Sequence, residues 1–471
     1  MGRHPAVATA GRRSAADDRR LHALLGLGYL LSYWYVYISY ISVRWSYMGF
    51  PYYPMTPWQI AFAALGVMAV AFSLPTRLRG PSSIFLWLLF AFVYVPTMAQ
   101  TYMLAEREAN VYTVPLAALT IVMIVACWIC GRVSPTAAQP VRSTPVRSTP
   151  VNMVPHQGLA YGFVVLALVL SGLQLFYYRD ILTFSDFTSS SDIYAQRFAA
   201  ADVTGGVIGY VRTYYSTVIA PPVIALGLLS RRYRWFIIPG LACFVISYMI
   251  DGSKISLIIP VAMLGIYGVV RWARSGVLVM TGALGALTFI CGLLTGQSAA
   301  LRYFADLILV RSIAIPGQQF ALYYDLFGTR GYTWWSNVKG INLFVPPPAT
   351  FAADPRWPML GKIVGEEYGG IASQNNSNAN PFAGEGVAAA GALGVVVIGL
   401  VLVAYLRLLD QTASSLHRTF VLLVSVPVAM ALTNIHLSTM LMSFGGAFWV
   451  AAFIVMSRLE KVDRLRAMRA V

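Results

Sequence analysis

The sequence predicts an all-α polytopic membrane protein with about twelve transmembrane helices and two enlarged outer loops. Three observations lead to this fold class. Hydrophobic residues make up 58% of the 471 residues and charged residues only 11%, whereas soluble domains are about 25% charged. Several apolar runs reach the ~20 residues that a spanning helix needs. These runs are rich in Leu, Val, Ala and Gly and lack period-2 alternation, which favours helices over a β-barrel.

The apolar runs divide into twelve predicted spans, and an even number places both chain ends in the cytoplasm. The positive-inside rule supports this orientation, because most of the 34 Lys and Arg residues fall in alternate loops and near the two ends. Topology therefore explains the net charge of +16 and no nucleic-acid partner is implied. The predicted spans are roughly 22–43, 59–75, 84–103, 113–131, 158–177, 204–230, 235–250, 255–270, 277–295, 382–406, 419–435 and 437–457.

The chain is predicted to have three parts. Residues 1–131 hold a cytoplasmic tail and four spans, and residues 158–471 hold eight spans. Between them, 132–157 contains the tandem VRSTPVRSTPV, a basic, proline-broken stretch typical of a disordered cytoplasmic linker. Two outer loops are long, at about 178–203 and 296–381. Loops of that length are usually functional, so we expect a functional site on the outer face.

The stretch ISYMIDGSKISLIIP (246–260) places Asp251 and Lys254 inside an otherwise apolar region. Basic clusters at 231–234 and 271–274 must be joined by two spans, so DGSK is predicted to be a tight outer turn shaped by Gly252. The two flanking halves are short of the ~20 residues of a full span. Two interpretations stay open: a turn recessed at the floor of an outward-facing cavity, or a hairpin tip with an Asp–Lys pair.

Three arginines are candidates for binding an anion. Arg311 lies in the apolar sequence LILVRSIAI and must find an anion or a group of carbonyls there. Arg212 lies in the apolar sequence GYVRTYYS and should face the interior of the helix bundle. Arg302 stands four residues before Asp306, a spacing that also predicts an ordinary ion pair on a helix surface.

Three residues are candidate general bases. His436, in the polar turn TNIHLS, is the only histidine on the predicted outer face, and a histidine there can take a proton from a hydroxyl. It can equally be a helix-end residue at the lipid interface. Glu366 and Glu367 lie in the larger loop, with Glu385 at the start of the next helix, and for each a solvated surface role is the simpler interpretation.

Several catalytic and metal-binding motifs are missing. The sequence has no P-loop, no HExxH, no Cys/His cluster and no DxD pair. Cys127 and Cys130 form a CWIC spacing, but it falls inside an apolar helix with no further ligand nearby, so a structural role is predicted. We therefore expect chemistry without a metal or a cofactor.

Three segments together resemble a known family. They are DGSKISL, in which Lys254 stands where the family usually has arginine, VRSIAIPGQQFALYYDLFG, and NPFAGEGVAAAGALG. With the twelve spans and the two enlarged loops, they resemble the bacterial O-antigen and capsular polysaccharide repeat-unit polymerases of the Wzy type, which are related to the O-antigen ligases.

The resemblance implies metal-independent glycosyl transfer at the periplasmic face of the inner membrane. The donor would be a glycan on undecaprenyl diphosphate, and the acceptor a hydroxyl of a second lipid-linked repeat unit. Arg311, Lys254, Arg212 and Arg302 would bind the diphosphate, and His436, Glu366 or Glu367 would serve as the base. The implied partners are these lipid-linked oligosaccharides, the bilayer and a chain-length regulator.

Other functions stay open at this point. An O-antigen ligase would use the same donor and transfer the glycan to lipid A core. A transporter of lipid-linked oligosaccharides is the non-enzymatic alternative, although transporters tend to show internal repeats, which are not visible here. A membrane O-acyltransferase would also use a histidine, but its acyl donor is cytoplasmic.

Overall fold

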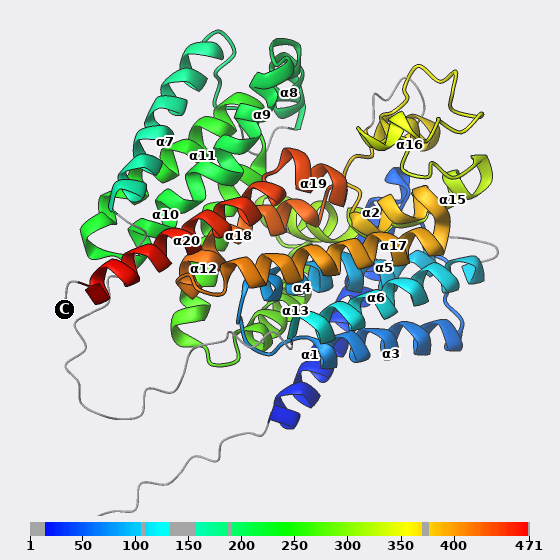
Figure 1. Ribbon diagram of the computed structural model, residues 1–471. Coiled ribbons are helices and arrows are strands. Elements are labelled where there is room, and N and C mark those ends of the chain that lie inside the picture. Colours follow the sequence, from blue (N-terminus) through cyan, green and yellow to red (C-terminus); the bar gives the residue numbers. More distant parts are fainter. Residues whose placement is uncertain (1–14, 105–108, 132–156, 187–189, 370–375, 470–471) are drawn as a thin grey trace, which may run out of the picture.

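The computed structural model describes residues 15–104, 109–131, 157–186, 190–369 and 376–469. The described residues form helices of the α, 3₁₀ and π types and no strand. This confirms an all-α chain (Figure 1). Nearly all of the predicted linker 132–157 lies outside the described residues, which resume with α7 at Gln157.

The α-helices of the first half of the chain are α1 (Ala15–Val36), α2 (Ser42–Arg44), α3 (Pro57–Ser73), α4 (Pro81–Leu89), α5 (Val95–Gln100), α6 (Thr113–Gly131), α7 (Gln157–Tyr177), α8 (Ser190–Val203), α9 (Gly206–Tyr214) and α10 (Ala220–Leu229). Those of the second half are α11 (Ile237–Asp251), α12 (Lys254–Trp272), α13 (Gly276–Leu294), α14 (Ala299–Ala305), α15 (Ile315–Arg330), α16 (Leu360–Gly369), α17 (Phe382–Ala413), α18 (Arg418–Leu432), α19 (Leu437–Ser443) and α20 (Gly446–Arg469).

Shorter segments join or interrupt these helices. The π segments are η1 (Tyr37–Ile41), η3 (Phe90–Tyr94), η6 (Tyr215–Ile219) and η8 (Asp306–Ala314). The 3₁₀ segments are η2 (Ser46–Met48), η4 (Thr101–Met103), η5 (Ala109–Tyr112), η7 (Arg231–Phe236) and η9 (Ile341–Leu343). A π segment leaves backbone groups out of the regular ladder and often marks a functional site.

Eight helices in the described part of the chain are long and apolar enough to cross a membrane. A ninth span results if α19 and α20, which meet at a 51° bend, are counted as one. These helices agree with a polytopic membrane protein. Each of the twelve predicted spans coincides with helical structure, but α3 and α18 are short apolar helices. The number twelve therefore stays a prediction.

Both long loops predicted from the sequence contain helix. The smaller one holds α8, and the larger one begins with the unbroken helical stretch α14–η8–α15, residues 299–330. This stretch packs against α5 and α17 and buries Leu309, Ile313 and Phe320. The first part of the larger predicted loop is therefore built into the helix bundle.

Helix α17 lies at the centre of one group of helices, in contact with α4, α6, α15 and α20, whereas α7 to α11 form a second group (Figure 1). Near its start α17 is broken, because Ala390 and Gly391 have non-helical backbone angles. Gly391 has a φ of +60°, which glycine adopts at no steric cost. The carbonyls of Ala388 and Ala389 accept hydrogen bonds from Thr333 N and Trp334 N at 2.9 and 3.0 Å.

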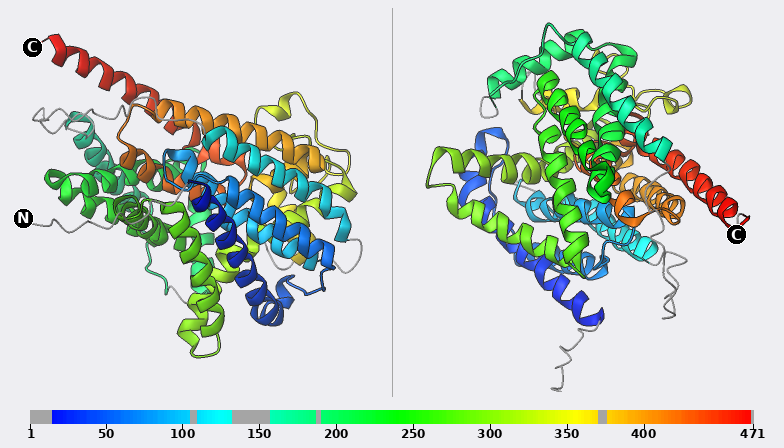
Figure 2. Two further views of the ribbon diagram at one scale, coloured as in Figure 1. Left: turned by 90° about the horizontal axis from the view of Figure 1, so that it is seen from below. Right: turned by 90° about the vertical axis from the view of Figure 1, so that its left-hand side faces the viewer.

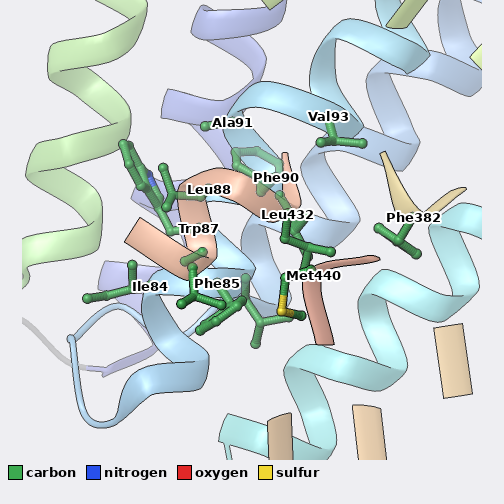
Figure 3. Packing of buried hydrophobic residues seen from close by; sticks show 14 of the residues in the cluster. Ile84, Phe85, Trp87, Leu88, Phe90, Ala91, Val93, Phe382, Leu432 and Met440 are labelled. Atoms are coloured by element: carbon green, nitrogen blue, oxygen red, sulfur yellow. The ribbon is translucent and has the colours of Figure 1, made fainter. Parts of the chain in front are cut away.

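The segment between α18 and α19 rests on a closely packed core. Leu432 and Met440 are fully buried and point toward Phe85 and Phe90 of the α4–η3 stretch (Figure 3). Phe382, the first residue of α17, belongs to the same cluster. Helix α20 then extends beyond the other helices (Figure 2). The core thereby fixes the turn that contains His436.

Candidate functional site

The DGSK sequence forms the tight turn that was predicted between α11 and α12. Gly252 ends α11 with a φ of +60°, and Ser253 precedes the first residue of α12, Lys254. Asp251 Oδ1 accepts a hydrogen bond from Ser253 N at 2.8 Å, which closes the turn. The turn therefore places Asp251 at the end of one apolar helix and Lys254 at the start of the next.

Helix α8, from the smaller predicted loop, packs directly on this turn. Gln196 is buried and donates from Nε2 to the carbonyls of Met249 at 2.5 Å and Thr183 at 3.0 Å. Its Oε1 accepts from Ser185 Oγ at 2.7 Å. A Cβ at Gly252 would lie 2.9 Å from Gln196 Oε1, so glycine is needed for the approach as well as for the turn. Helix α8 and the DGSK turn are therefore packed together.

Four basic side chains gather around the turn. Lys254 donates from Nζ to the hydroxyl of Tyr303, and its Nζ lies 4.7 Å from the centroid of that ring, which is a cation–π contact. Arg311 and Arg197 are both near enough for their charges to act on Lys254. Arg197 reaches the site from α8 and donates through Nε to the carbonyl of Asp251 at 3.3 Å.

Arg212, from α9, completes the group on the side of Asp251. The charges of Arg212 and Arg197 both act on the Asp251 carboxylate. The structure therefore brings together three of the four residues predicted to bind a diphosphate, namely Arg212, Lys254 and Arg311. We call these three and Arg197 the basic cluster. It combines cations from α8, α9, α12 and η8.

Arg302, the fourth predicted binding residue, has another partner. It donates from Nε to the carbonyl of Thr295 at 3.1 Å. The i,i+4 pair with Asp306 does not form, because Asp306 Oδ1 instead accepts from Tyr40 Oη at 2.6 Å and Trp45 Nε1 at 3.0 Å. A binding role for Arg302 stays a prediction.

The π segment η8 determines where Arg311 projects. At its end, Gln100 Nε2 donates to the carbonyl of Ala314 at 2.6 Å, and Tyr33 in turn donates to Gln100 Oε1. A buried glutamine from α5 therefore holds the end of this segment. The apolar residues Leu309, Val310 and Ile313 are buried, whereas Arg311 is exposed. The site around Arg311 is thus open on one side.

His436 lies in a second polar group. Its Nε2 is 3.0 Å from Asn380 Nδ2, and the ring of Tyr323 meets the imidazole edge-to-face with centroids 6.1 Å apart. Glu385 accepts a hydrogen bond from Ser438 N at 3.2 Å through Oε2. Burial lowers the pKa of His436, and the charge of Glu385 partly offsets this. His436 is therefore neutral at pH 7 and can accept a proton.

The two predicted loop carboxylates are held in ion pairs. Glu366 Oε2 pairs with Arg356 Nη1 at 3.1 Å, and Glu367 pairs with Arg330. Arg356 also pairs with Asp354 at 2.6 Å and thereby lowers the pKa of that carboxyl. These contacts give Glu366 and Glu367 a structural role in the loop, and their role as a base stays a prediction.

The basic cluster and the His436 group are joined by one helix. Arg311 in η8 and Tyr323 in α15 belong to the same helical stretch, and twelve residues correspond to roughly 18 Å along a helix axis. On the other side, Tyr214, two residues after Arg212, donates to the carbonyl of Met442 in α19 at 3.2 Å. The two groups are too far apart to bind one atom, but an extended substrate can reach both.

Two further residues of the site, Arg197 and Asn380, were not foreseen from the sequence. Arg197 reaches the basic cluster only because α8 folds back on the DGSK turn, a contact between residues more than fifty positions apart. Asn380 was visible only as part of the NPFAGEG segment. Glu385 was foreseen as a carboxylate at the start of α17, without its contact to the segment that follows His436.

The described residues contain no group of three or more His, Cys, Asp or Glu side chains placed to hold a metal ion. Cys127 and Cys130 are buried and not joined by a disulfide. No protein-family model, no curated protein and no solved structure matches this chain.

Proposed function

We propose that the protein is a membrane glycosyltransferase that polymerises oligosaccharide repeat units linked to undecaprenyl diphosphate. The reaction would take place at the periplasmic face of the bacterial inner membrane and need no metal. The observation that supports this most is the basic cluster, in which the charges of Arg212 and Arg197 act on Asp251 and those of Arg311 and Arg197 act on Lys254.

The charge of this cluster suits a diphosphate. Cations at the edge of a membrane lose hydration and need anionic partners. The cluster has four cations, and Arg197 donates to the backbone carbonyl of Asp251. A lipid-linked diphosphate carries the negative charge that such a group of cations attracts, and arginine binds its oxygens in a bidentate manner.

In the proposed reaction, a hydroxyl of the acceptor sugar attacks the anomeric carbon of the donor glycan. The bond between that carbon and the phosphate oxygen breaks, and its electron pair leaves with undecaprenyl diphosphate. The hydroxyl proton passes to His436, which is neutral at pH 7. The basic cluster stabilises the charge that develops on the leaving diphosphate.

The test uses purified protein in liposomes with an undecaprenyl-diphosphate-linked repeat unit. We expect a ladder of longer glycans from the wild type and its loss in Arg311→Ala and Lys254→Ala. Arg179→Ala is the matched control, because Arg179 is an exposed arginine paired with Asp180. A wild type that leaves the repeat unit unchanged contradicts polymerase activity.

Two alternatives are distinguished by the same preparation. Transfer of the glycan to added lipid A core, without self-polymerisation, identifies an O-antigen ligase. Movement of a labelled lipid-linked unit across the bilayer without any new glycosidic bond identifies a transporter. The structure favours an enzyme, because His436, Asn380 and Glu385 form a polar group with a potential base.

A further inference from the structure

Two buried acceptor atoms near His436 have no hydrogen-bond partner among the described residues. They are Asn380 Oδ1 and Glu385 Oε1. Asn380 is 0% exposed and Glu385 is 2% exposed. Buried polar groups are nearly always paired, since leaving one unpaired costs the full desolvation penalty. Two unpaired acceptors beside one histidine therefore require an explanation.

The unpaired state of Glu385 contrasts with the other buried carboxylate of the same helix. Asp410, near the end of α17, is also buried, but Ser82 satisfies it with its backbone N at 3.0 Å and its Oγ at 2.5 Å. In Glu385, only Oε2 is bonded, to Ser438 N. Both oxygens of Asp410 are therefore hydrogen-bonded, whereas Oε1 of Glu385 has no partner among the described residues.

The position of Asn380 is equally specific. Its side chain folds over Gly384, where a Cβ would overlap Asn380 Oδ1, so that only glycine leaves room for it. The amide Nδ2 is engaged with His436 Nε2 at 3.0 Å. Tyr323, whose ring meets His436 edge-to-face, donates its hydroxyl to the carbonyl of Ser377 at 3.1 Å.

We propose that Asn380 Oδ1 and Glu385 Oε1 bind hydroxyl groups of the acceptor saccharide and hold the attacking hydroxyl against His436. This inference rests on the proposed function and adds its acceptor site. Both atoms only accept hydrogen bonds, so their ligand must be a donor. A sugar with several neighbouring hydroxyls meets that requirement, and its ring can extend toward the basic cluster that holds the donor.

The group-transfer step in this site is balanced. The attacking hydroxyl displaces the Asn380 amide NH₂ from Nε2 of His436. Its oxygen bonds to the donor's anomeric carbon, and its proton passes to that Nε2. The carbon–oxygen bond to the diphosphate breaks with its electron pair. The charge of Glu385 acts on His436 and stabilises the imidazolium that forms.

Glu385→Gln is the decisive variant. Ser438 N needs an acceptor, so the amide oxygen takes the place of Oε2 and the amide NH₂ takes the place of Oε1. The amide NH₂, a hydrogen-bond donor, then faces the sugar hydroxyl in place of the acceptor Oε1. We expect the KM for the acceptor repeat unit to rise about 10- to 100-fold, with the thermal unfolding temperature unchanged. Asn380→Ala should raise the same KM.

Asp410→Asn is the control, because it removes a buried carboxylate from the same helix while breaking bonds that are already made. It should lower the unfolding temperature and leave the acceptor KM unchanged. If Glu385→Gln and Asn380→Ala both polymerise with wild-type kinetics, the acceptor site is wrong and the proposed function stands. If the wild type forms no ladder, the proposed function itself fails.

Discussion

Lys254 donates to the hydroxyl of Tyr303 and stands over the face of the same ring, with its Nζ 4.7 Å from the centroid. The contact joins the first residue of α12 to α14, which begins the larger predicted loop. The charges of Arg311 and Arg197 both act on this ammonium. An aromatic ring holds a cation without neutralising its charge.

The first prediction concerns this lysine. Lys254→Arg should retain polymerisation, because arginine keeps the positive charge and can stack on Tyr303. Lys254→Ala should lower kcat about 100- to 1000-fold, the range for removing one group that stabilises developing negative charge. Kinetics with a lipid-linked repeat unit measure both variants. Equal loss in Lys254→Arg and Lys254→Ala would contradict a role for the positive charge at this position.

The second prediction concerns the docking of α8 on the DGSK turn. Gly252→Ala should destabilise the protein by about 1–2 kcal/mol, because alanine is strained at a φ of +60°, and its Cβ would also press on Gln196 Oε1. Gly265→Ala in α12 is the matched control, since a Cβ there meets nothing within 4 Å. Thermal unfolding in detergent measures the difference. Similar unfolding temperatures for the two variants would contradict the packing described here.

The third prediction follows from the pKa of His436. Burial lowers it below the ordinary value of 6.5, and Glu385 raises it in part. Above pH 6.5 the imidazole is neutral, and it stays neutral in the folded protein as the pH falls until the lowered pKa is reached. The acid limb of kcat/KM for the acceptor should therefore lie below pH 6.5. Glu385→Gln should shift the limb to still lower pH, because the charge that raises the pKa is removed.

Asp410→Asn is again the control, because Asp410 is bound by Ser82 and does not act on His436. Its acid limb should match that of the wild type. A limb above pH 6.5 in the wild type, or one that does not move in Glu385→Gln, would exclude His436 as the group that titrates.

The sequence was sufficient for the fold class because composition and apolar run length determine it directly. It was also sufficient for the DGSK turn, since glycine and the two flanking basic clusters define a turn locally. The contact of Arg197 with Asp251 could not be predicted, because nothing in the residues 178–203 indicates on which helix they dock. The burial of Glu385 and Asn380 likewise depends on the segment after α18, far along the chain.

The first part of the larger predicted loop, residues 299–330, is helical in the structure. Arg302, Asp306, Arg311 and the Pro316-Gly317 pair all lie in the loop that was predicted to begin at about 296. In the structure these polar groups are accommodated inside a helical stretch, with Asp306 bound by Tyr40 and Trp45 and the end of the π segment held by Gln100. Side chains from other helices therefore supply what the local sequence lacks.

The last prediction separates the candidate bases. Glu366→Gln weakens the ion pair with Arg356, and Glu367→Gln the pair with Arg330. The Glu367–Arg330 pair is partly exposed, and such pairs contribute about 0–1 kcal/mol, so Glu367→Gln should lower the unfolding temperature slightly. Glu366→Gln should lower it more, because the side chains of Glu366 and Arg356 are only 12% and 20% exposed. In both variants the polymerisation rate should stay near that of the wild type. His436→Ala should lower the rate about 10²- to 10⁴-fold, the contribution of a positioned general base. The rates of the three variants, measured side by side at pH 7, identify the base. A large loss in Glu366→Gln or Glu367→Gln, with His436→Ala still active, would show that a loop carboxylate and not His436 is the base.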